Sequence, residues 1–339
     1  MTQPEPEYGQ IKQSDFYPPW WARNRHVQTI FPRFFQRRRQ VALEWQNLDL
    51  PDNDFVELAW TPKPDDNAPL VVCFHGLEGS AKSHYANDML ANLFEQGWQA
   101  VMMHFRGCGR QLNRTARAYH SGDTQDALFL LDWLRKRFPS RPLAAMGFSL
   151  GANMLLKLLG ENPNSSGIRA AVAISPPFKL AECGEAIQSG FSRLYQRYLI
   201  RSMCERTMAR MRSVDHGDKL TLRDREIMGL KTFRDFDQRV TAPLHGFSSA
   251  DDYYRQCSSV SYLKRIKQPT LILHSKDDPF MSPSVVPKVE DLSPAVTLEL
   301  SEKGGHVGFM QGVPWRPQIW LHERVAAFFR PYLDSVTSA

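Results

Sequence analysis

Apolar positions along the chain fall into two alternating patterns. Short continuous apolar runs, typical of buried strands, are followed by segments with apolar residues at helical spacing. The clearest runs cover residues 70–74, 98–105, 143–146 and 170–174. Strands and helices that alternate with short connections predict an α/β fold, a mostly parallel sheet with helices on both faces. Before these runs, residues 41–48 and 55–60 alternate apolar and polar positions around a turn sequence, which predicts a hairpin.

The alternation of strand and helix patterns stops between residues 178 and 265. That segment has no convincing strand pattern and contains a long helical pattern at 191–211. Strand patterns resume at 270–274 and 296–300, and a last helix pattern follows. Because the interruption lacks linker composition, we interpret it as a helical cap inserted into the sheet domain. The predicted organisation is an N-terminal arm (1–40), a first core part (41–177), the cap (178–265) and a second core part (266–339).

The first 40 residues differ from the rest of the chain in charge. Residues 1–15 are polar, and we expect them to be poorly ordered. Residues 16–40 have no acidic residue and carry the equivalent of the whole net charge of +6, on Arg23, Arg25, Arg33, Arg37, Arg38 and Arg39. We interpret this aromatic and arginine-rich segment as an arm packed on the body, whose prolines argue against a long amphipathic helix. Contact with anionic lipid or acyl substrate, and a nucleic-acid arm, are the alternatives.

Composition narrows the classes of protein that remain. The 339 residues, 42% of them hydrophobic, suffice for one large or two modest globular domains. No apolar run reaches the roughly 18 residues of a transmembrane helix, and the N-terminus lacks a signal sequence. Five scattered cysteines without a C-x-x-C pair predict neither a zinc site nor a disulfide framework. We therefore expect a cytoplasmic protein, and the charge-balanced body argues against nucleic-acid binding.

One pentapeptide lies at the junction of a strand pattern and a helix pattern. Residues 147–151 read Gly-Phe-Ser-Leu-Gly, after the apolar run 143–146 and before an apolar helix pattern at 152–159. A serine between glycines on a sharp strand-to-helix turn is the arrangement that exposes a nucleophilic hydroxyl above a sheet. Ser149 is therefore the candidate nucleophile. The alternative is a small-residue turn that packs a helix closely against a sheet.

A serine hydroxyl needs a base, and the base needs a carboxylate to orient it. On this architecture the acid and then the histidine follow the nucleophile, each in a loop after a strand. The pattern 270–274 is followed by Asp277 and Asp278, and the pattern 296–300 by His306 in a glycine-rich loop. We predict His306 as the base. Asp278, just before a proline, is favoured as the acid over Asp277, whose alternative role is a turn or cap carboxylate.

Acyl transfer also needs N–H donors for the oxyanion. The N–H of Leu150, at the start of the helix after the serine, is one candidate. We expect the second in residues 75–79, which follow the apolar run 70–74, and choose Leu77 with Glu78 as the alternative. His75 in the same loop is predicted to be structural.

These features together resemble a known superfamily. Residues 56–332 are similar to the α/β-hydrolase fold, in particular to the YheT-type esterases of bacteria, whose animal relatives are linked to phospholipid and medium-chain ester cleavage. The similarity rests on residues 24–29, 75–80, 104–108, 119–122, 147–151, 277–280 and 304–309. It implies a charge relay of Ser149, Asp278 and His306. One difference is Ala152, where a second glycine is frequent in such turns.

The patterns together predict a serine hydrolase that cleaves carboxylic esters through an acyl-enzyme, without cofactor or metal. Acyl transfer or thioester cleavage by the same residues is the alternative within enzymes. A non-catalytic lipid- or partner-binding protein with a hydrolase fold is the alternative outside enzymes. The expected partner is a small-molecule ester or lipid-like substrate and no nucleic acid. Peripheral membrane contact through residues 16–40 stays open, and the sequence does not specify an oligomeric state.

Two features of the cap pattern bear on the substrate. Its methionines are adaptable side chains that suit an acyl substrate, with core packing as the alternative; they are Met203, Met208 and Met211. An arginine recurs every four residues at Arg193, Arg197 and Arg201. This stripe could meet a phosphate or carboxylate, but a solvated helix face is the favoured interpretation.

Overall fold

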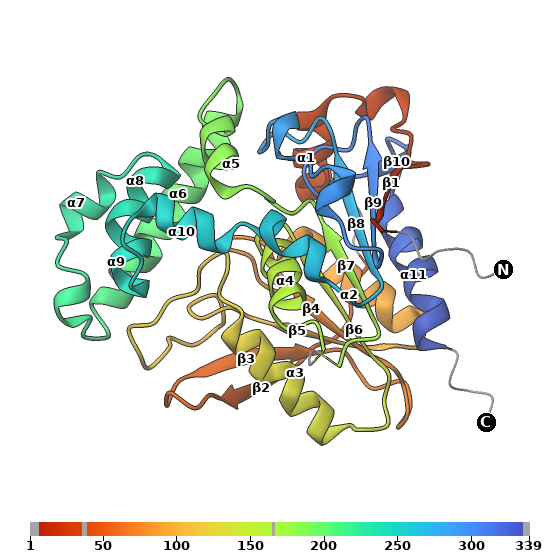
Figure 1. Cartoon of the computed structure of the whole chain (residues 1–339), viewed down its shortest axis with the longest axis horizontal. Helices are drawn as coiled ribbons and strands as arrows, with labels where there is room; N and C mark the ends of the chain where they lie inside the picture. The colour runs from red at the N-terminus through yellow and green to blue at the C-terminus, as the bar shows by residue number, and fades with distance from the viewer. Residues whose placement is uncertain (1–6, 36–38, 165–166, 335–339) are drawn as a thin grey trace.

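The computed structural model describes residues 7–35, 39–164 and 167–334. Nine of its strands form one sheet in the order β1-β9-β8-β7-β6-β4-β5-β3-β2 (Figure 1). β2 and β3 pair antiparallel, as do β3 and β5, and the other neighbours are parallel. The strands are β1 (Gln10–Gln13), β2 (Glu44–Asp49), β3 (Phe55–Trp60), β4 (Leu70–Phe74), β5 (Gln99–Met103), β6 (Leu143–Phe148), β7 (Ala170–Ile174), β8 (Thr270–Ser275) and β9 (Val296–Ser301). The predicted α/β class with a mostly parallel sheet is confirmed.

Two pairs of helices cover the two faces of this sheet. α3 (Gln125–Arg137) and α4 (Leu150–Glu161) bury their apolar stripes on one face, and α2 (His84–Glu95) and α11 (Trp320–Leu333) on the other. The central strands are buried along their whole length, because helices cover both of their sides. Removal of these apolar surfaces from water stabilises the layered core.

The register of the parallel strands brings their carboxyl ends to one edge of the sheet. Phe74 at the end of β4 lies opposite Gly147 of β6, and Ser275 at the end of β8 lies opposite Ser301 of β9. The loops that follow these strands are therefore neighbours. In open α/β sheets this edge is where ligands bind.

Between β7 and β8 the chain forms a helical lobe beyond the strand ends, at the left of Figure 1. No strand interrupts it in the described residues. Part of the lobe has its own small apolar cluster, which includes Ile200, Cys204, Ile227 and Phe236. Its α-helices are α5 (Leu180–Ala186), α6 (Ser192–Met211), α7 (Asp224–Met228), α8 (Phe233–Phe236), α9 (Ala242–His245) and α10 (Ala250–Cys257).

The N-terminal segment is more ordered than its sequence predicts. Residues 10–13 form the edge strand β1, paired in parallel with β9, so the expectation of disorder over residues 1–15 is wrong there. Phe16 is buried against Phe309 and Trp320 of the core. Residues 1–6, and Arg37 and Arg38 of the predicted arm, lie outside the described residues.

The prolines of the arm do not prevent a helix. α1 (Arg25–Phe35) contains Pro32, whose missing N–H leaves one backbone hydrogen bond of the helix unmade. The side-chain oxygen of Asn24 accepts the N–H of His26 at 2.8 Å and satisfies one of the free donors at the start of the helix. The side chain of Gln28 in α1 accepts a hydrogen bond from Met310 of β10 (Met310–Val313). β10 pairs antiparallel with β11 (Arg316–Ile319), and the sequence patterns did not predict this pair.

Candidate active site

Ser149 occupies a strained turn between β6 and α4. Its φ of +52° and ψ of −117° are unfavourable for a residue with a side chain. Its N–H donates to the Ile174 carbonyl at 2.8 Å, which ties the turn to β7. A Cβ on Gly147 would lie 2.5 Å from the Gly151 carbonyl oxygen, and a Cβ on Gly151 equally close to that of His75. The serine itself therefore takes the strained conformation, and the two glycines permit the close approach of strand, turn and helix.

His306 and Asp278 form a buried pair in the loops after β9 and β8. His306 Nδ1 lies 2.7 Å from Asp278 Oδ2, and the carboxylate is 1% exposed. The other carboxylate oxygen accepts the N–H of Phe280 at 2.8 Å, and the Phe280 ring stacks on the imidazole with centroids 4.2 Å apart. Asp278 thus fixes one edge of the imidazole ring, and the Phe280 ring covers one of its faces. An imidazole that donates Nδ1–H to a carboxylate presents Nε2 as a proton acceptor.

The neighbouring Asp277 contacts backbone and not the histidine ring. Its Oδ1 accepts the N–H groups of Gly304 and Gly305 at 2.9 and 3.0 Å and the hydroxyl of Ser275 at 3.2 Å. Burial raises its pKa, while these hydrogen bonds act in the opposite direction. Asp277 therefore fixes the loop that carries His306.

The N-terminal arm supports the same loop from the other side. Thr29 Oγ1 accepts the His306 N–H at 3.0 Å, and Gln28 Oε1 accepts the Met310 N–H at 2.7 Å. The Gln28 amide also donates to the carbonyls of Ala22 and Met310. Sequence periodicity did not identify these contacts. The only sequence signal was the resemblance of residues 24–29 to the hydrolase family.

The loop after β4 lies next to the serine turn, since a Cβ on Gly76 would lie 3.2 Å from the Cβ of Ser149. Two tyrosine hydroxyls accept the flanking donors, Gly76 N–H to Tyr85 at 2.8 Å and Glu78 N–H to Tyr119 at 3.0 Å. The described hydrogen bonds leave the Leu77 N–H without an acceptor, which favours Leu77 over Glu78 as an oxyanion donor. Leu150 is the first residue of α4, where the N–H has no acceptor within the helix.

Glu78 connects this loop to the helical lobe. It is one of the few non-glycine residues with positive φ, at +56°. Its carboxylate accepts the hydroxyls of Tyr119 at 2.9 Å and Ser202 at 2.7 Å and the Arg206 Nε–H at 3.0 Å. The carboxylate therefore holds the strained loop against α6.

His75 is built into the core. Its Nε2 accepts the Phe105 N–H at 3.1 Å, and its Nδ1 lies 2.7 Å from the Gly76 carbonyl oxygen. Burial lowers its pKa to about 3, so the ring stays neutral. The geometry fits the predicted structural role.

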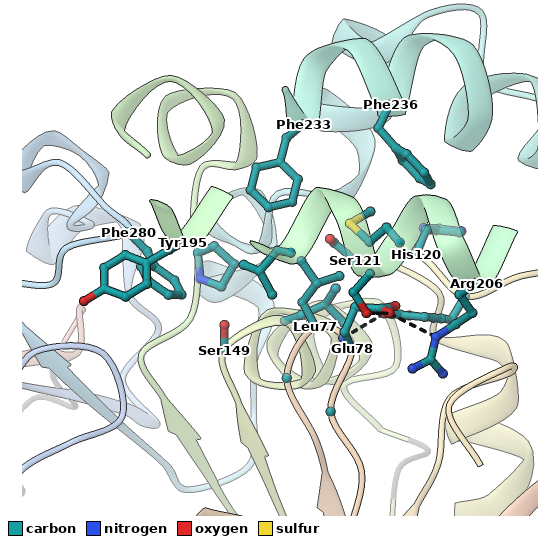
Figure 2. Close-up of a pocket in the computed structure, with 18 of the residues that line it drawn as sticks. Leu77, Glu78, His120, Ser121, Ser149, Tyr195, Arg206, Phe233, Phe236 and Phe280 are labelled. Atoms are coloured by element: carbon teal, nitrogen blue, oxygen red, sulfur yellow. Dashed lines mark hydrogen bonds and ion pairs between the residues drawn. The ribbon is translucent and has the colours of Figure 1, made fainter. Parts of the chain in front are cut away.

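A cavity of about 780 Å³ lies between the strand ends and the helical lobe, and Leu77, Ser149, Leu150 and His306 all line it. Figure 2 shows Ser149 at its foot, below α6. Tyr195 and Phe280 lie on one side of the serine, Leu77, Glu78 and Arg206 on the other, and Phe233 and Phe236 above. Thr29, Ile30 and Arg33 of the arm contribute to the wall on the Tyr195 side. The cavity is therefore lined by Ser149, His306, the N-terminal arm and α6.

α6 presents two sets of arginines with different surroundings. Arg193, Arg197 and Arg201 are exposed, as a solvated face requires. Arg206 and Arg210 line the cavity, and the sequence patterns did not single them out. Their signal is the recurrence of polar residues every four positions from Ser202 through Arg206 to Arg210, one face of the helix. Of the three methionines, Met203 lines the cavity and packs against the lobe's apolar cluster; Met208 and Met211 pack only in that cluster.

The described residues contain no helix long and apolar enough to cross a membrane. They also contain no group of three or more histidine, cysteine or carboxylate side chains placed to hold a metal ion.

Comparison with known proteins places this architecture in a class. A family model described as the alpha/beta hydrolase fold matches residues 69–313, and the chain belongs to this family. The chain is 44% identical over 324 residues, 95% of either chain, to the Escherichia coli (strain K12) protein named "Putative esterase YheT". It is therefore a member of the YheT-type group within the α/β hydrolases.

A more distant relative and a solved structure agree with this assignment. The chain is 26% identical over 325 residues to human "Phospholipase ABHD3", covering 91% of this chain and 77% of the relative. The structure of the Pyrococcus furiosus esterase Pf2001 superposes with a TM-score of 0.57, covers 96% of this chain and 99% of the esterase, and is 16% identical. At that identity the likeness supports the fold alone.

Proposed function

We propose that this chain hydrolyses carboxylic esters with an acyl or lipid-like part, and that Ser149, His306 and Asp278 carry out the reaction. Membership of the α/β hydrolases supports an enzyme of the esterase and lipase type. The observation that carries this proposal is the shared cavity, which is lined by a serine on a strained turn and by a histidine that a buried carboxylate orients.

In the proposed reaction, Ser149 Oγ attacks the acyl carbonyl while its proton passes to His306 Nε2. The N–H groups of Leu77 and Leu150 donate to the negative oxygen of the tetrahedral intermediate. His306 then gives the proton to the leaving alcohol, and an acyl-serine remains. Water attacks the acyl-serine and gives a proton to His306, which returns it to Ser149 Oγ as the acid is released. Asp278 stabilises the imidazolium that forms twice in this cycle.

The walls of the cavity support an apolar acyl part. Phe233 and Phe236 lie opposite the serine, and Met203 also lines the cavity. Burial of an alkyl chain against these side chains gives about 0.8 kcal/mol per methylene. Acyl transfer to an alcohol and thioester cleavage use the same steps with another acceptor or leaving group. Product partition with added alcohol acceptors separates hydrolysis from transfer.

A panel of p-nitrophenyl esters from two to twelve carbons tests the proposal. The unaltered protein should turn over the panel with a preference for one range of chain length. Ser149→Ala should reduce kcat by more than about 10⁴-fold, because it removes the nucleophile of the proposed reaction. Equal turnover by the variant would show that Ser149 is not the nucleophile.

A fluorophosphonate probe tests the non-catalytic alternative directly. Covalent labelling of the folded protein, lost in Ser149→Ala, requires an activated serine and does not depend on the choice of substrate. A folded protein that the probe does not label would favour a lipid- or partner-binding role.

Contact between the arm and a lipid surface stays a prediction. Tyr17 and Trp20 are each 77% exposed and Phe34 66% exposed, near arginines that attract anionic headgroups. Co-sedimentation with vesicles containing phosphatidylserine, compared with neutral vesicles, measures this contact. A Trp20→Ala, Phe34→Ala protein should bind the anionic vesicles less well than the unaltered protein.

A further inference from the structure

The cavity wall carries more positive than negative charge. Its lysine and arginine side chains are Arg33, Lys82, Arg106, Arg206 and Arg210. Its carboxylates are Glu78 and Asp237. An apolar acyl chain does not need this excess of positive charge. Arg33 and Lys82 are exposed, so Arg106, Arg206 and Arg210 are the cations that require an account.

Arg106 and Arg206 are neutralised by carboxylates of the protein. Arg106 is buried and lies within 3.2 Å of the carboxylates of Asp52, Asp54 and Asp126. Arg206 pairs with Glu78 at 3.0 Å. Both guanidinium groups therefore serve the structure of the wall.

Arg210 lacks such a partner. Its residue is only 8% exposed, and its described contacts include no carboxylate within ion-pair distance. Its Nη2 donates to the Thr115 carbonyl oxygen at 3.2 Å, while its Nε is buried without a hydrogen-bond partner. Burial lowers its pKa to about 10, so the side chain stays charged at neutral pH. A buried cation with an unsatisfied donor is costly unless an anion joins it.

A second buried nitrogen without a partner belongs to the same wall. His245 Nε2 is buried and makes no described hydrogen bond, and the ring lies 4.7 Å, centroid to centroid, from that of His120. Burial lowers the pKa of His245 to about 2 and that of His120 to about 3, so both rings are neutral. The remaining carboxylate, Asp237, accepts the hydroxyls of Thr241 at 2.7 Å and Tyr254 at 2.8 Å and is not paired with Arg210.

From these observations we propose that the Arg210 end of the cavity is an anion-binding subsite for a carboxylate or phosphate carried by the ester substrate. Arg210 lies one turn of α6 beyond Arg206, about 6 Å along the helix axis. Figure 2 shows Arg206 on the Leu77 side of Ser149, so the subsite lies on that side and away from Tyr195. This inference deepens the proposed ester hydrolysis and rests on it for the use of the cavity as the substrate site.

Binding of three compounds with the same alkyl chain tests the subsite without turnover. Octyl phosphate, octanoate and 1-octanol are titrated into the full-length protein by calorimetry below their aggregation concentrations. We expect octyl phosphate or octanoate to bind at least tenfold more tightly than octanol, because charge-assisted hydrogen bonds to a desolvated arginine favour the anion. The two anions distinguish a phosphate from a carboxylate preference. Equal affinity for all three compounds would overturn the proposal.

Variants of α6 assign the preference to Arg210. Arg210→Gln should weaken binding of the preferred anion tenfold or more and leave octanol affinity within twofold, and Arg210→Lys should retain part of the anion preference. Arg193→Gln, on the exposed face of the same helix, is the matched control and should change neither. An anion preference that survives in folded Arg210→Gln would place the site elsewhere and contradict the proposal. If Arg210→Gln does not fold, Arg210→Lys decides the question: an anion preference weaker than that of the unaltered protein supports the assignment to Arg210, and an unchanged preference contradicts it.

The outcome is separable from that of the ester panel. Turnover of neutral esters without an anion preference contradicts the subsite alone. An anion preference that depends on Arg210, in a protein that hydrolyses no ester, supports the subsite and contradicts the proposed hydrolysis.

Discussion

The floor and the roof of the cavity are built in different ways. The floor consists of the loops after the strands, and five of the six described non-glycine residues with positive φ lie there: Glu78, Ser149, Ser175, Val307 and Phe309. The roof is α6, a regular helix of 20 residues. The side of the helix on which a residue lies decides whether its side chain faces the cavity or solvent. The floor therefore positions its groups by backbone strain and hydrogen bonds, and the roof by side-chain identity.

This difference has a consequence for substitutions. A floor residue is held by several partners, so its replacement disturbs the geometry of the reacting atoms and should lower kcat. A roof residue on a regular helix is replaceable without backbone change, so its replacement should alter which substrate binds. Substitutions in the floor and in the roof therefore test this division by the kinetic constant that each one changes.

Asp278→Asn should reduce kcat by about 10³ to 10⁴-fold. The amide that replaces the carboxylate stabilises the wrong tautomer of His306 and cannot stabilise the imidazolium. Asp277→Asn is the matched control, because its remaining amide oxygen can still accept the N–H groups of Gly304 and Gly305, and it should lose less than tenfold. Steady-state rates on one short ester measure both. Comparable losses in the two variants would contradict the assignment of the acid.

Asp237→Asn should reduce the loss in free energy of unfolding between pH 4 and pH 7.5 by about 2 to 3 kcal/mol. Burial raises the pKa of Asp237 from 3.8 to about 6, so between these values the native state binds more protons than the unfolded state. This group therefore makes the native protein less stable as pH rises from about 4 to 6, and the cost stays constant above. Asn cannot titrate and should remove this contribution.

Unfolding in denaturant at pH 4 and pH 7.5 measures the difference. The unaltered protein should lose more stability between the two pH values than Asp237→Asn. Parallel profiles would mean that Asp237 titrates normally in the folded state. At a single pH, Asp237→Asn should change the activation free energy for a short ester by less than it changes the free energy of unfolding. The reason is that Asp237 belongs to the helical lobe and not to the floor.

The floor was largely predictable from the sequence, because its chemistry depends on local patterns. Glycines at 147 and 151 around Ser149, and the position of His306 after the last long strand pattern, are local signals. The choice of Asp278 over Asp277 agrees with the hydrogen bonds, although both positions share one turn. The role of the two glycines differs from the sequence interpretation. They provide the space for the close approach of strand and helix, and Ser149 itself takes the positive φ.

The roof and the arm were less predictable, because their roles arise from contacts between distant parts of the chain. Thr29 and His306 are 277 positions apart, and Arg206 reaches Glu78 across 128. The regular spacing of Arg193, Arg197 and Arg201 drew attention to the exposed face of α6. The cavity face carries Arg206 and Arg210, whose burial depends on how α6 lies over the sheet. Likewise, β1 forms only because β9 offers an edge.

Thr29→Val should reduce kcat about fivefold. It removes the acceptor of the His306 N–H and keeps the shape of the side chain, so the histidine loop loses one hydrogen bond worth about 1 kcal/mol and its orientation loosens. Thr29→Ser keeps the hydroxyl and should restore the rate. A lower kcat in both variants would mean that the arm acts through packing and not through the hydrogen bond to His306. An effect on KM alone would mean that the arm acts through contact with the substrate.

Arg197→Gln should have the smallest effect, less than twofold in kcat/KM on a soluble ester. Its side chain is exposed on α6, and a solvated charge without a buried partner contributes little to rate or stability. The same variant on esters presented in anionic vesicles sharpens the comparison. A selective loss on vesicles would mean that the outer face of the roof contacts lipid, and the exposed arginines would then share the role predicted for the arm. Equal rates in both formats would leave selectivity to the inner face of α6, where Arg206 and Arg210 lie.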